Sequence, residues 1–549
     1  MNKTQQCLFS MLLLVVSPLS LAKETPDWNY VMQPGESIWS IAHELLTDWR
    51  HWQALESYNN VRNDRQMPPG TVLRIPRNLI SEQASDIRVV NVSGTVTAEV
   101  DLEHGARAHL PLLRGRNLRP GDRIRTAAQS SVLLEFADGT QVLILESSLL
   151  RVEQASVMGQ QRKVVDIQVF LESGEAEIRA NPKKLPGSRF LIDTPAAFAT
   201  TKGTQYRVRA EAERTAAEVT QGLIGVTNSR GDTRVAAGYG TLARADEAPR
   251  PPAKLLPAPG LENIQQPLRY LPEQIRWAAL PEATGYRVQI SPDPEFSALV
   301  VDQSVTRAQF NLPVRLQDQP YWLRVSGISS EGLQGFAQVQ KIVIDARPFP
   351  PLQQTPVQGA SLYVGAVDFS WSQPELAASY HLEIARDEGF TDRVRLEQGI
   401  RAAQWQETIT RPGVYFWRVN SVTASGEEGP SGVIGQFNVM ALPPTPELQQ
   451  PVIDQEQLTL RWREEPGVAR YQLQLAGEPE FANPELDQIT TDSALSVVRP
   501  ASGNYYLRVR GVYEDGVSGG WSEPQQVVVP VESWWPLAIP ASTLLLLLL

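Results

Sequence analysis

Side chains able to do acid–base or nucleophilic chemistry are plentiful in this 549-residue sequence, but they do not form a catalytic pattern. There is no nucleophile elbow between a strand and a helix, no Walker loop and no metalloprotease histidine pair. Glu36 could act as an acid, yet no second carboxylate stands at a defined spacing from it, and glycoside hydrolysis normally takes two. We therefore expect a protein that is not an enzyme.

The sequence also lacks residue patterns typical of metal, disulfide or cofactor sites. The one cysteine, Cys7, lies in an apolar N-terminal segment, and the five histidines are dispersed. His104 and His109 are near neighbours, but no further histidine or carboxylate cluster with ligand spacing surrounds them, so the sequence predicts no metal site, no disulfide and no cofactor. A net charge of -11 without a basic stripe argues against nucleic acid as a partner.

The N-terminus has the pattern of an export signal. Lys3 precedes an apolar run over residues 8–16, and small residues at positions 20–22 suit a cleavage site. We expect residues 1–22 to be a secretory signal peptide, which places the mature protein in the periplasm or cell envelope.

The C-terminus, residues 531–549, is also apolar. Trp534 and Trp535 precede an uncharged run that ends in six leucines, a pattern typical of a membrane interface. A helix over residues 537–549 would be about 20 Å long, short of the roughly 30 Å hydrocarbon core. Three interpretations stay open: a tail that enters one leaflet, a longer segment that crosses completely, or a frayed end.

Residues 28–77 predict a small strand–helix–helix–strand domain. A short strand at residues 30–32 is stopped by Gln-Pro-Gly, and Ser37 is placed to cap a helix. That helix has apolar residues at helical spacing, and a second helix carries Trp52, Leu55 and Tyr58 on one face. A strand over residues 72–76 then returns beside the first. The large aromatics Trp39, Trp49 and Trp52 are expected in the core.

This segment resembles a LysM module through residues 35–38 (GESI), 41–42 (IA), 59–60 (NN) and 69–76 (PGTVLRIP). The resemblance implies binding of peptidoglycan or a chitin-like glycan that contains N-acetylglucosamine, in a shallow groove between two loops. Glu36 stands where aspartate is usual, which leaves the glycan preference open. The implied glycan-binding residues are Pro34, Gly35, Glu36, Ser37, Ile38, Asn60, Val61, Met67 and Pro68.

Residues 86–245 alternate apolar and polar side chains between Gly, Asp and Asn, which predicts an all-β region. A hairpin is expected around Asp138-Gly139. Residues 171–178 are expected to form a strand, a turn and a second strand, and residues 206–226 a further strand–turn–strand series.

The same region is similar to the FecR family domain, the periplasmic sensing portion of iron-transport regulators. The resemblance is carried by residues 118–122 (LRPGD) with Thr126, and by four further segments: 136–140 (FADGT), 174–176 (GEA), 193–195 (DTP) and 202–206 (KGTQY). It implies a sensing or protein-binding role. In the regulators a transmembrane helix and an anti-sigma segment precede this domain, whereas here a signal peptide and the LysM-like segment do, so direct control of a sigma factor is not expected.

A proline-rich segment, residues 246–263, is expected to be an extended spacer. Three repeats follow, at residues 264–346, 347–441 and 442–530, each with a tryptophan nine positions before a tyrosine. The period fits one small β-sandwich per repeat, and the array resembles tandem fibronectin type III domains. Each repeat is expected to hold its own core and to serve as a spacer or protein-binding arm.

Together these patterns predict a mainly β, multidomain envelope protein. The favoured interpretation is a non-catalytic protein that binds peptidoglycan through its LysM-like head and presents the β-domains to an envelope protein partner. The alternative is a periplasmic sensor that acts through the FecR-like domain.

Overall fold

The computed structural model describes residues 27–63, 67–101, 107–159, 164–182, 187–201 and 205–531. The predictions for the signal peptide and for the tail beyond Val531 lie outside these residues. The fold is mainly β, with 52% strand and 4% helix, as predicted. Within the described ranges no helix is both long and apolar enough to cross a membrane. The chain divides into two compact units, Met1–Asp345 and Ala346–Leu549.

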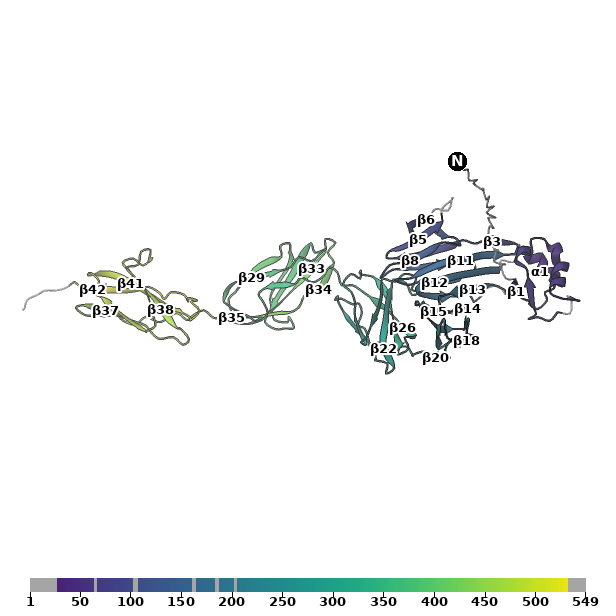
Figure 1. Cartoon of the computed structure of the whole chain (residues 1–549). Coiled ribbons are helices and arrows are strands. Elements are labelled where there is room, and N and C mark those ends of the chain that lie inside the picture. Colours follow the sequence, from purple (N-terminus) through teal and green to yellow (C-terminus); the bar gives the residue numbers. More distant parts are fainter. Residues whose placement is uncertain are drawn as a thin grey trace, which may run out of the picture. The chain divides into compact units, whose positions relative to one another are not determined.

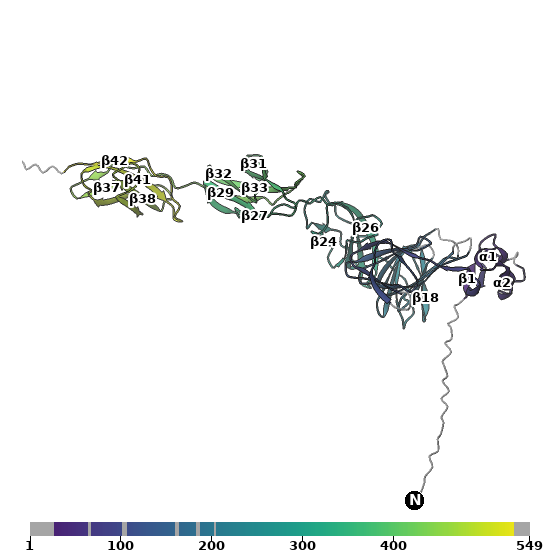
Figure 2. The same cartoon turned by 90° about the horizontal axis from the view of Figure 1, so that it is seen from above.

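The head has the predicted strand–helix–helix–strand order (Figures 1 and 2). Strands β1 and β2 pair antiparallel, with Trp28 opposite Ile75 and Val31 opposite Val72. The elements are β1 (Trp28–Val31), α1 (Ile38–Leu45), the 3₁₀ helix η1 (Trp49–His51), α2 (Trp52–Tyr58) and β2 (Val72–Ile75).

Helix α1 begins where the sequence predicts. Ser37 and Ser40 form a reciprocal capping box, which satisfies N–H groups left free at the helix N-terminus. Four residues of α1 at helical spacing are buried against the small sheet: Ile38, Ile41, Ala42 and Leu45.

The aromatic core expected for the head is only partly present. Trp39 is 49% exposed and Trp49 is 43% exposed, so their assignment to the core is wrong. Trp39 directly follows buried Ile38 and therefore points about 100° away from the buried face of α1. Trp52 is half-buried, whereas Tyr58 is 45% exposed and its hydroxyl donates to Asp27 Oδ2 at 2.6 Å.

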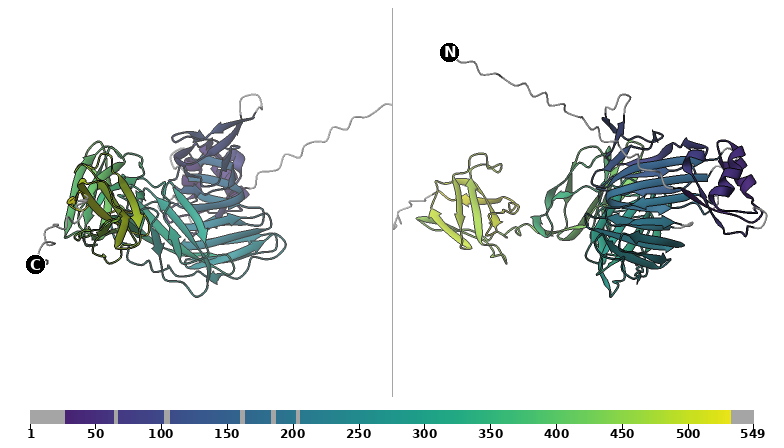
Figure 3. Two further views of the ribbon diagram at one scale, coloured as in Figure 1. Left: turned by 90° about the vertical axis from the view of Figure 1, so that its left-hand side faces the viewer. Right: turned by 45° about the vertical axis from the view of Figure 1, so that its right-hand side comes forward.

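Among the described residues, eighteen strands, β3 to β20, follow and pair into one closed arrangement. Figure 3 shows many of these strands lying side by side. A continuous apolar core is buried among them. Their bounds are β3 (Glu82–Ala84), β4 (Ile87–Ser93), β5 (Val96–Asp101), β6 (Arg107–Pro111), β7 (Asn117–Leu118), β8 (Arg123–Thr126), β9 (Ser131–Glu135), β10 (Gln141–Ile144), β11 (Leu149–Met158), β12 (Val164–Arg179), β13 (Arg189–Asp193), β14 (Phe198–Thr201), β15 (Gln205–Ala210), β16 (Arg214–Gln221), β17 (Leu223–Asn228), β18 (Gly231–Ala236), β19 (Tyr239–Arg244) and β20 (Ala253–Lys254).

The hairpin predicted around Asp138-Gly139 is confirmed by the pairing of β9 with β10. Gly139 adopts a φ of 80°, and Asp138 Oδ1 accepts a hydrogen bond from the Thr140 N–H at 2.9 Å. These are the backbone and side-chain features that favour this turn chemistry.

The turn predicted within residues 171–178 is wrong, because β12 runs unbroken through it from Val164 to Arg179. Its first half pairs with β11 and β13, and its second half pairs with β10 and β15. Gly174, at φ +92°, lies where the strand passes from one set of partners to the other, and a Cβ there would lie 2.5 Å from the Ser148 Cα. Glycine here permits a close approach within a continuous strand.

The spacer predicted for residues 246–263 is also wrong in part. Strand β20 pairs with β19, and the Leu255 N–H donates to the Gly238 carbonyl at 2.9 Å. Leu255 is buried beside Leu242 and Leu333, and the Leu256 carbonyl accepts from the Phe336 N–H. The two leucines give this proline-rich segment an apolar anchor, so it lies against the β-structure.

The first repeat is a two-sheet sandwich in the same unit. Its Trp277 and Tyr286 rings pack edge to face with centroids 5.4 Å apart. The sheets are β21 (Gln274–Arg276) with β24 (Gln309–Asn311), and the order β23 (Val301–Val305), β22 (Ala283–Ser291), β25 (Pro320–Ser329), β26 (Gln334–Val343).

This first repeat does not stand alone, contrary to expectation. Phe296 and Leu299 share a buried cluster with Leu133, Leu143 and Leu145 of the preceding β-region. The repeat therefore buries part of its apolar surface against another domain.

The second and third repeats, in the other unit, are sandwiches with separate cores. Trp371 packs on Tyr380 with ring centroids 5.5 Å apart, and Trp462 on Tyr471 at 5.6 Å. The second contains β27 (Gln353–Thr355), β28 (Ala360–Tyr363), β29 (Gly365–Trp371), β30 (Ser379–Ala385), β31 (Arg393–Ile400), β32 (Gln404–Ile409), β33 (Gly413–Val422), β34 (Glu428–Ser431) and β35 (Gly435–Met440). The third contains β36 (Val452–Ile453), β37 (Gln457–Arg461), β38 (Arg470–Ala476), β39 (Leu486–Thr490), β40 (Ala494–Val498), β41 (Gly503–Val512) and β42 (Gln525–Val529).

Candidate functional site

The first loop of the predicted groove, residues 34–38, is a hydrogen-bonded turn. Gly35 has a φ of +85°, and the Glu36 N–H donates to the Gln33 carbonyl at 3.2 Å. The Glu36 carboxylate accepts from the Tyr30 hydroxyl at 2.7 Å and from the Gln33 N–H at 2.7 Å. Glu36 therefore braces the loop, which is a structural role that its isolation in the sequence did not reveal.

The second loop, residues 60–68, is described at its two ends. Asn60 has a φ of 54°, and the Val61 N–H donates to the Glu56 carbonyl at 2.9 Å. Residues 64–66 lie outside the described residues. At the far end, the Thr71 N–H donates to the Pro68 carbonyl at 3.2 Å in a turn with Gly70 at φ +89°.

The structure brings the bases of the two loops together. The Gly70 N–H donates to the Met32 carbonyl and the Met32 N–H to the Thr71 carbonyl, both at 2.9 Å. Ile38 belongs to the buried core of the head, and the partly buried side chains of Val61 and Met67 pack against that core. Ile38 is fully buried, so its side chain supports the first loop from beneath.

The exposed members of the predicted set are Pro34, Gly35, Asn60 and Pro68. They offer an amide side chain, apolar proline rings and backbone groups, while the one carboxylate, Glu36, is hydrogen-bonded within its own loop. These exposed, described groups suit a hydroxyl- and amide-bearing ligand.

A feature that the sequence interpretation missed lies beside this groove. The rings of Trp39, His43 and Trp49 contact one another on the outer face of α1 and η1. The spacing of Trp39 and His43, one helical turn apart and off the buried face, was the available signal.

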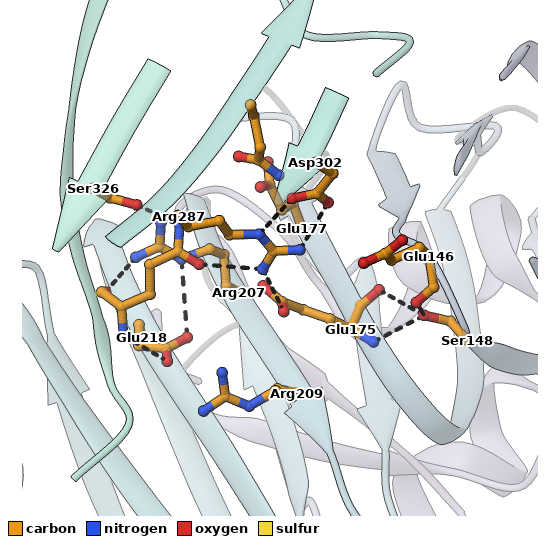
Figure 4. A network of polar contacts seen from close by, with 12 residues as sticks. Glu146, Ser148, Glu175, Glu177, Arg207, Arg209, Glu218, Arg287, Asp302 and Ser326 are labelled. Atoms are coloured by element: carbon orange, nitrogen blue, oxygen red, sulfur yellow. Dashed lines mark hydrogen bonds and ion pairs between the residues drawn. The ribbon is translucent and has the colours of Figure 1, made fainter. Parts of the chain in front are cut away.

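A second polar constellation joins the β-region to the first repeat (Figure 4). Arg287 of β22 donates to Glu175 Oε2 at 2.6 Å and to both carboxylate oxygens of Asp302, at 2.7 and 2.8 Å. Arg324 is paired with Glu177 of β12. Arg207 donates to the Gly335 carbonyl at 2.9 Å. These six buried or nearly buried charges therefore take part in the contact between the two domains.

The charges of this network perturb one another's pKa values. Burial alone would lower the pKa of Arg287, but Glu175 and Asp302 outweigh it and raise the pKa well above its usual value. Burial likewise opposes ionisation of Glu177, yet Arg324 and Arg207 hold the pKa of Glu177 below its usual value. Burial raises the pKa of Glu218. Every arginine here has a carboxylate or carbonyl partner, so the network works as an interdomain contact.

A hollow of about 420 Å³ opens on another part of the β-region. Its one ionisable residue is Asp193, whose pKa is raised by burial and whose Oδ2 accepts from Gln168 at 2.5 Å. The lining residues are Phe170, Asp193, Thr194, Pro195, Ala196, Ala197, Phe198, Asn228, Ser229 and Ala245.

Other sequence signals for chemistry gain no support. Residues 516–520 have the letters G-x-S-x-G, but Ser518 lies between two strands, β41 and β42, and no helix follows it among the described residues up to Val531. In the part of the chain that the structure describes, no three His, Cys, Asp or Glu residues are grouped to hold a metal ion.

Comparison with known families assigns the two N-terminal domains. Residues 30–76 match the family model of the LysM domain, and residues 122–225 match that of the FecR protein. The chain contains a LysM domain and a FecR domain. Both domains are typical of cell-envelope proteins, and both are binding or signalling modules.

Two solved structures are similar to parts of the chain. One, described as a candidate anti-sigma factor from Parabacteroides distasonis, has 19% sequence identity over 24% of this chain and 59% of its own, with a TM-score of 0.20. The FN1–FN3 domains of chicken CNTN1 have 14% identity over 50% of this chain and 98% of their own, with a TM-score of 0.23. No curated protein matches the chain.

Proposed function

We propose that the protein is a non-catalytic cell-envelope factor whose LysM domain binds peptidoglycan, through N-acetylglucosamine units held between residues 34–38 and 60–68. The FecR domain and the three fibronectin type III-like repeats then form an arm that presents a surface to an envelope protein. The observation that carries the proposal is the pair of braced Pro-Gly turns at the two loops of a matched LysM domain.

The polarity of the loops agrees with this ligand. The hydrogen-bonded turns at residues 33–36 and 68–71 lower the ordering cost of binding. Their backbone groups and the exposed amide side chain of Asn60 suit the N-acetyl and hydroxyl groups of the sugar. A single module gives no avidity, so binding should be weak.

Titration calorimetry of the full chain with an N-acetylglucosamine trimer tests the proposal. The wild type should bind, and Glu36→Ala should bind more weakly because the Tyr30 and Gln33 contacts that brace the first loop are lost. Gln53→Ala, an exposed change on α2, should bind like the wild type. Absence of binding by the wild type would contradict the proposal.

A second candidate function, sensing by the FecR domain, is favoured by the hollow around Asp193. It places a half-buried carboxylate among apolar and small polar side chains, and Asp193-Thr194-Pro195 belongs to the segment that matches the FecR model. A photo-crosslinking residue at Phe198, on its rim, should capture a ligand or protein in cells, whereas one at Leu223 should not. Phe198 and Leu223 are 39% and 41% exposed, so equal capture at both would count against a sensing site.

A further inference from the structure

The outer face of the LysM domain carries an exposed aromatic cluster, defined as Trp39, His43 and Trp49. Trp39 and Trp49 leave 49% and 43% of their surface in solvent, whereas Trp28 and Tyr30 of the same domain are 4% and 1% exposed. A small domain that buries some large aromatics and exposes two others side by side presents a candidate binding surface.

The three rings are ordered against one another. Trp39 stacks on His43 with centroids 5.5 Å apart and planes at 27°, and Trp49 lies 6.5 Å from Trp39 and 6.3 Å from His43. The turn that carries Trp49 is fixed by Asp48, whose Oδ1 accepts from the Arg50 N–H at 3.0 Å. Because the rings already restrain one another, a ligand that stacks on them loses little further side-chain entropy.

The composition of the cluster indicates the chemistry of its ligand. It is aromatic throughout, and the other exposed large apolar residues of the head, Val31, Tyr58 and Val72, belong to β1, α2 and β2. The negative face of an aromatic ring attracts the weakly positive C–H groups on the apolar face of a sugar ring. A protein interface would be expected to add aliphatic residues over a wider area.

The position of the cluster connects it to the groove. Trp39 directly follows Ile38, the last residue of the first loop, and lies in the first turn of α1. Trp39 is therefore the ring of the cluster that lies next to the first loop along the chain.

We propose that this aromatic cluster is a second contact for the glycan, on which a sugar ring stacks beyond the groove. The inference rests on the proposed function and deepens it, because it makes the preferred ligand an extended N-acetylglucosamine polymer. Short fragments fill the groove alone, and longer ones reach the rings as well.

Calorimetry of the full chain with the N-acetylglucosamine trimer and hexamer tests this. The double variant Trp39→Ala/Trp49→Ala should bind the hexamer about tenfold more weakly than the wild type, about 1.4 kcal/mol, and the trimer equally well. Trp39→Phe/Trp49→Phe should keep most of the hexamer affinity because it keeps the rings. Gln53→Ala is the matched surface control.

The outcomes separate the two claims. If the wild type binds neither oligomer, the proposed function fails and this inference fails with it. If the wild type binds both and the alanine variant binds the hexamer as tightly as the wild type does, only the inference is overturned. Circular dichroism checks that each variant folds. If the alanine variant does not fold, Trp39→Leu/Trp49→Leu replaces it, because leucine keeps apolar area but has no aromatic face. The leucine variant should then bind the hexamer more weakly than the phenylalanine variant does.

Discussion

At the scale of residues, the charged side chains of the first unit do more structural than chemical work. Glu175 and Glu177 lie on β12, and the arginines that pair with them, Arg287 and Arg324, come from a different domain. A buried pair of this kind contributes little net stability as a whole, but removal of one partner leaves an uncompensated charge. We expect these ion pairs to fix the position of the first repeat on the FecR domain.

Glu177→Gln tests this account through pH. The pKa of Glu177 lies below its ordinary value of 4.5, so the ionised form is favoured in the folded state. The stabilisation is therefore complete above the unfolded-state pKa and is lost as pH falls through the folded-state pKa. Urea unfolding at about pH 7 should find Glu177→Gln less stable by about 3 kcal/mol, and the difference should shrink below about pH 4.5.

The control is Glu99→Gln, which removes a surface pair with Arg107 at 3.0 Å. This change should alter the unfolding free energy little, because surface ion pairs are screened by solvent. A pH-independent difference for Glu177→Gln would show that the buried charge is not the stabilising feature.

At the scale of elements, the sequence predicted local patterns well and long-range partners poorly. The Ser37 cap, the buried face of α1 and the Asp138-Gly139 hairpin follow from side-chain periodicity and turn chemistry within a few residues. The unbroken β12 could not be predicted in this way. A glycine such as Gly174 is equally compatible with a turn and with a strand that passes close to another residue, here Ser148. The exposed Trp39 was missed for a related reason, since burial of a tryptophan depends on which elements cover its face.

Comparison of Gly174→Ala with Gly115→Ala separates two causes of lost stability: a steric clash of the new Cβ, and backbone strain at a positive φ. Both glycines have positive φ, but a Cβ at Gly174 would clash with Ser148, whereas a Cβ at Gly115 would meet nothing within 4 Å. Gly115→Ala should cost about 1–2 kcal/mol, and Gly174→Ala should cost about 1–3 kcal/mol more, by chemical denaturation. Equal costs would mean that the neighbourhood of Ser148 adapts and that close packing does not define the crossing in β12.

At the scale of the whole molecule, the domains are less independent than a string of modules. The LysM domain shares its core with Met158 and Val164 of the β-region, and the first repeat shares a cluster around Phe296. The spacing of the repeats predicted three equivalent units, but it contained no sign that one of them docks on another domain. That docking depends on surface residues of both domains. These residues are far apart in the sequence, so no local pattern predicts that they come into contact.

Trp371→Ala and Trp277→Ala should therefore behave differently in calorimetry. Each removes a buried tryptophan and should cost about 3–5 kcal/mol. Trp371→Ala should remove only the transition of the second repeat, because that repeat has its own core. Trp277→Ala should lower the temperature of the transition that includes the FecR domain, because the first repeat unfolds with it; an unchanged FecR transition would contradict the docked arrangement.

The central claim is that the LysM domain anchors the protein to the wall, and co-sedimentation with purified peptidoglycan sacculi tests it most directly. The mature protein should pellet with sacculi and be released by excess N-acetylglucosamine hexamer. Glu36→Ala combined with Trp39→Ala and Trp49→Ala should stay largely in the supernatant, while Gln53→Ala should pellet like the wild type. If the triple variant pellets as fully as the wild type, or the hexamer releases nothing, the LysM domain is not the anchor.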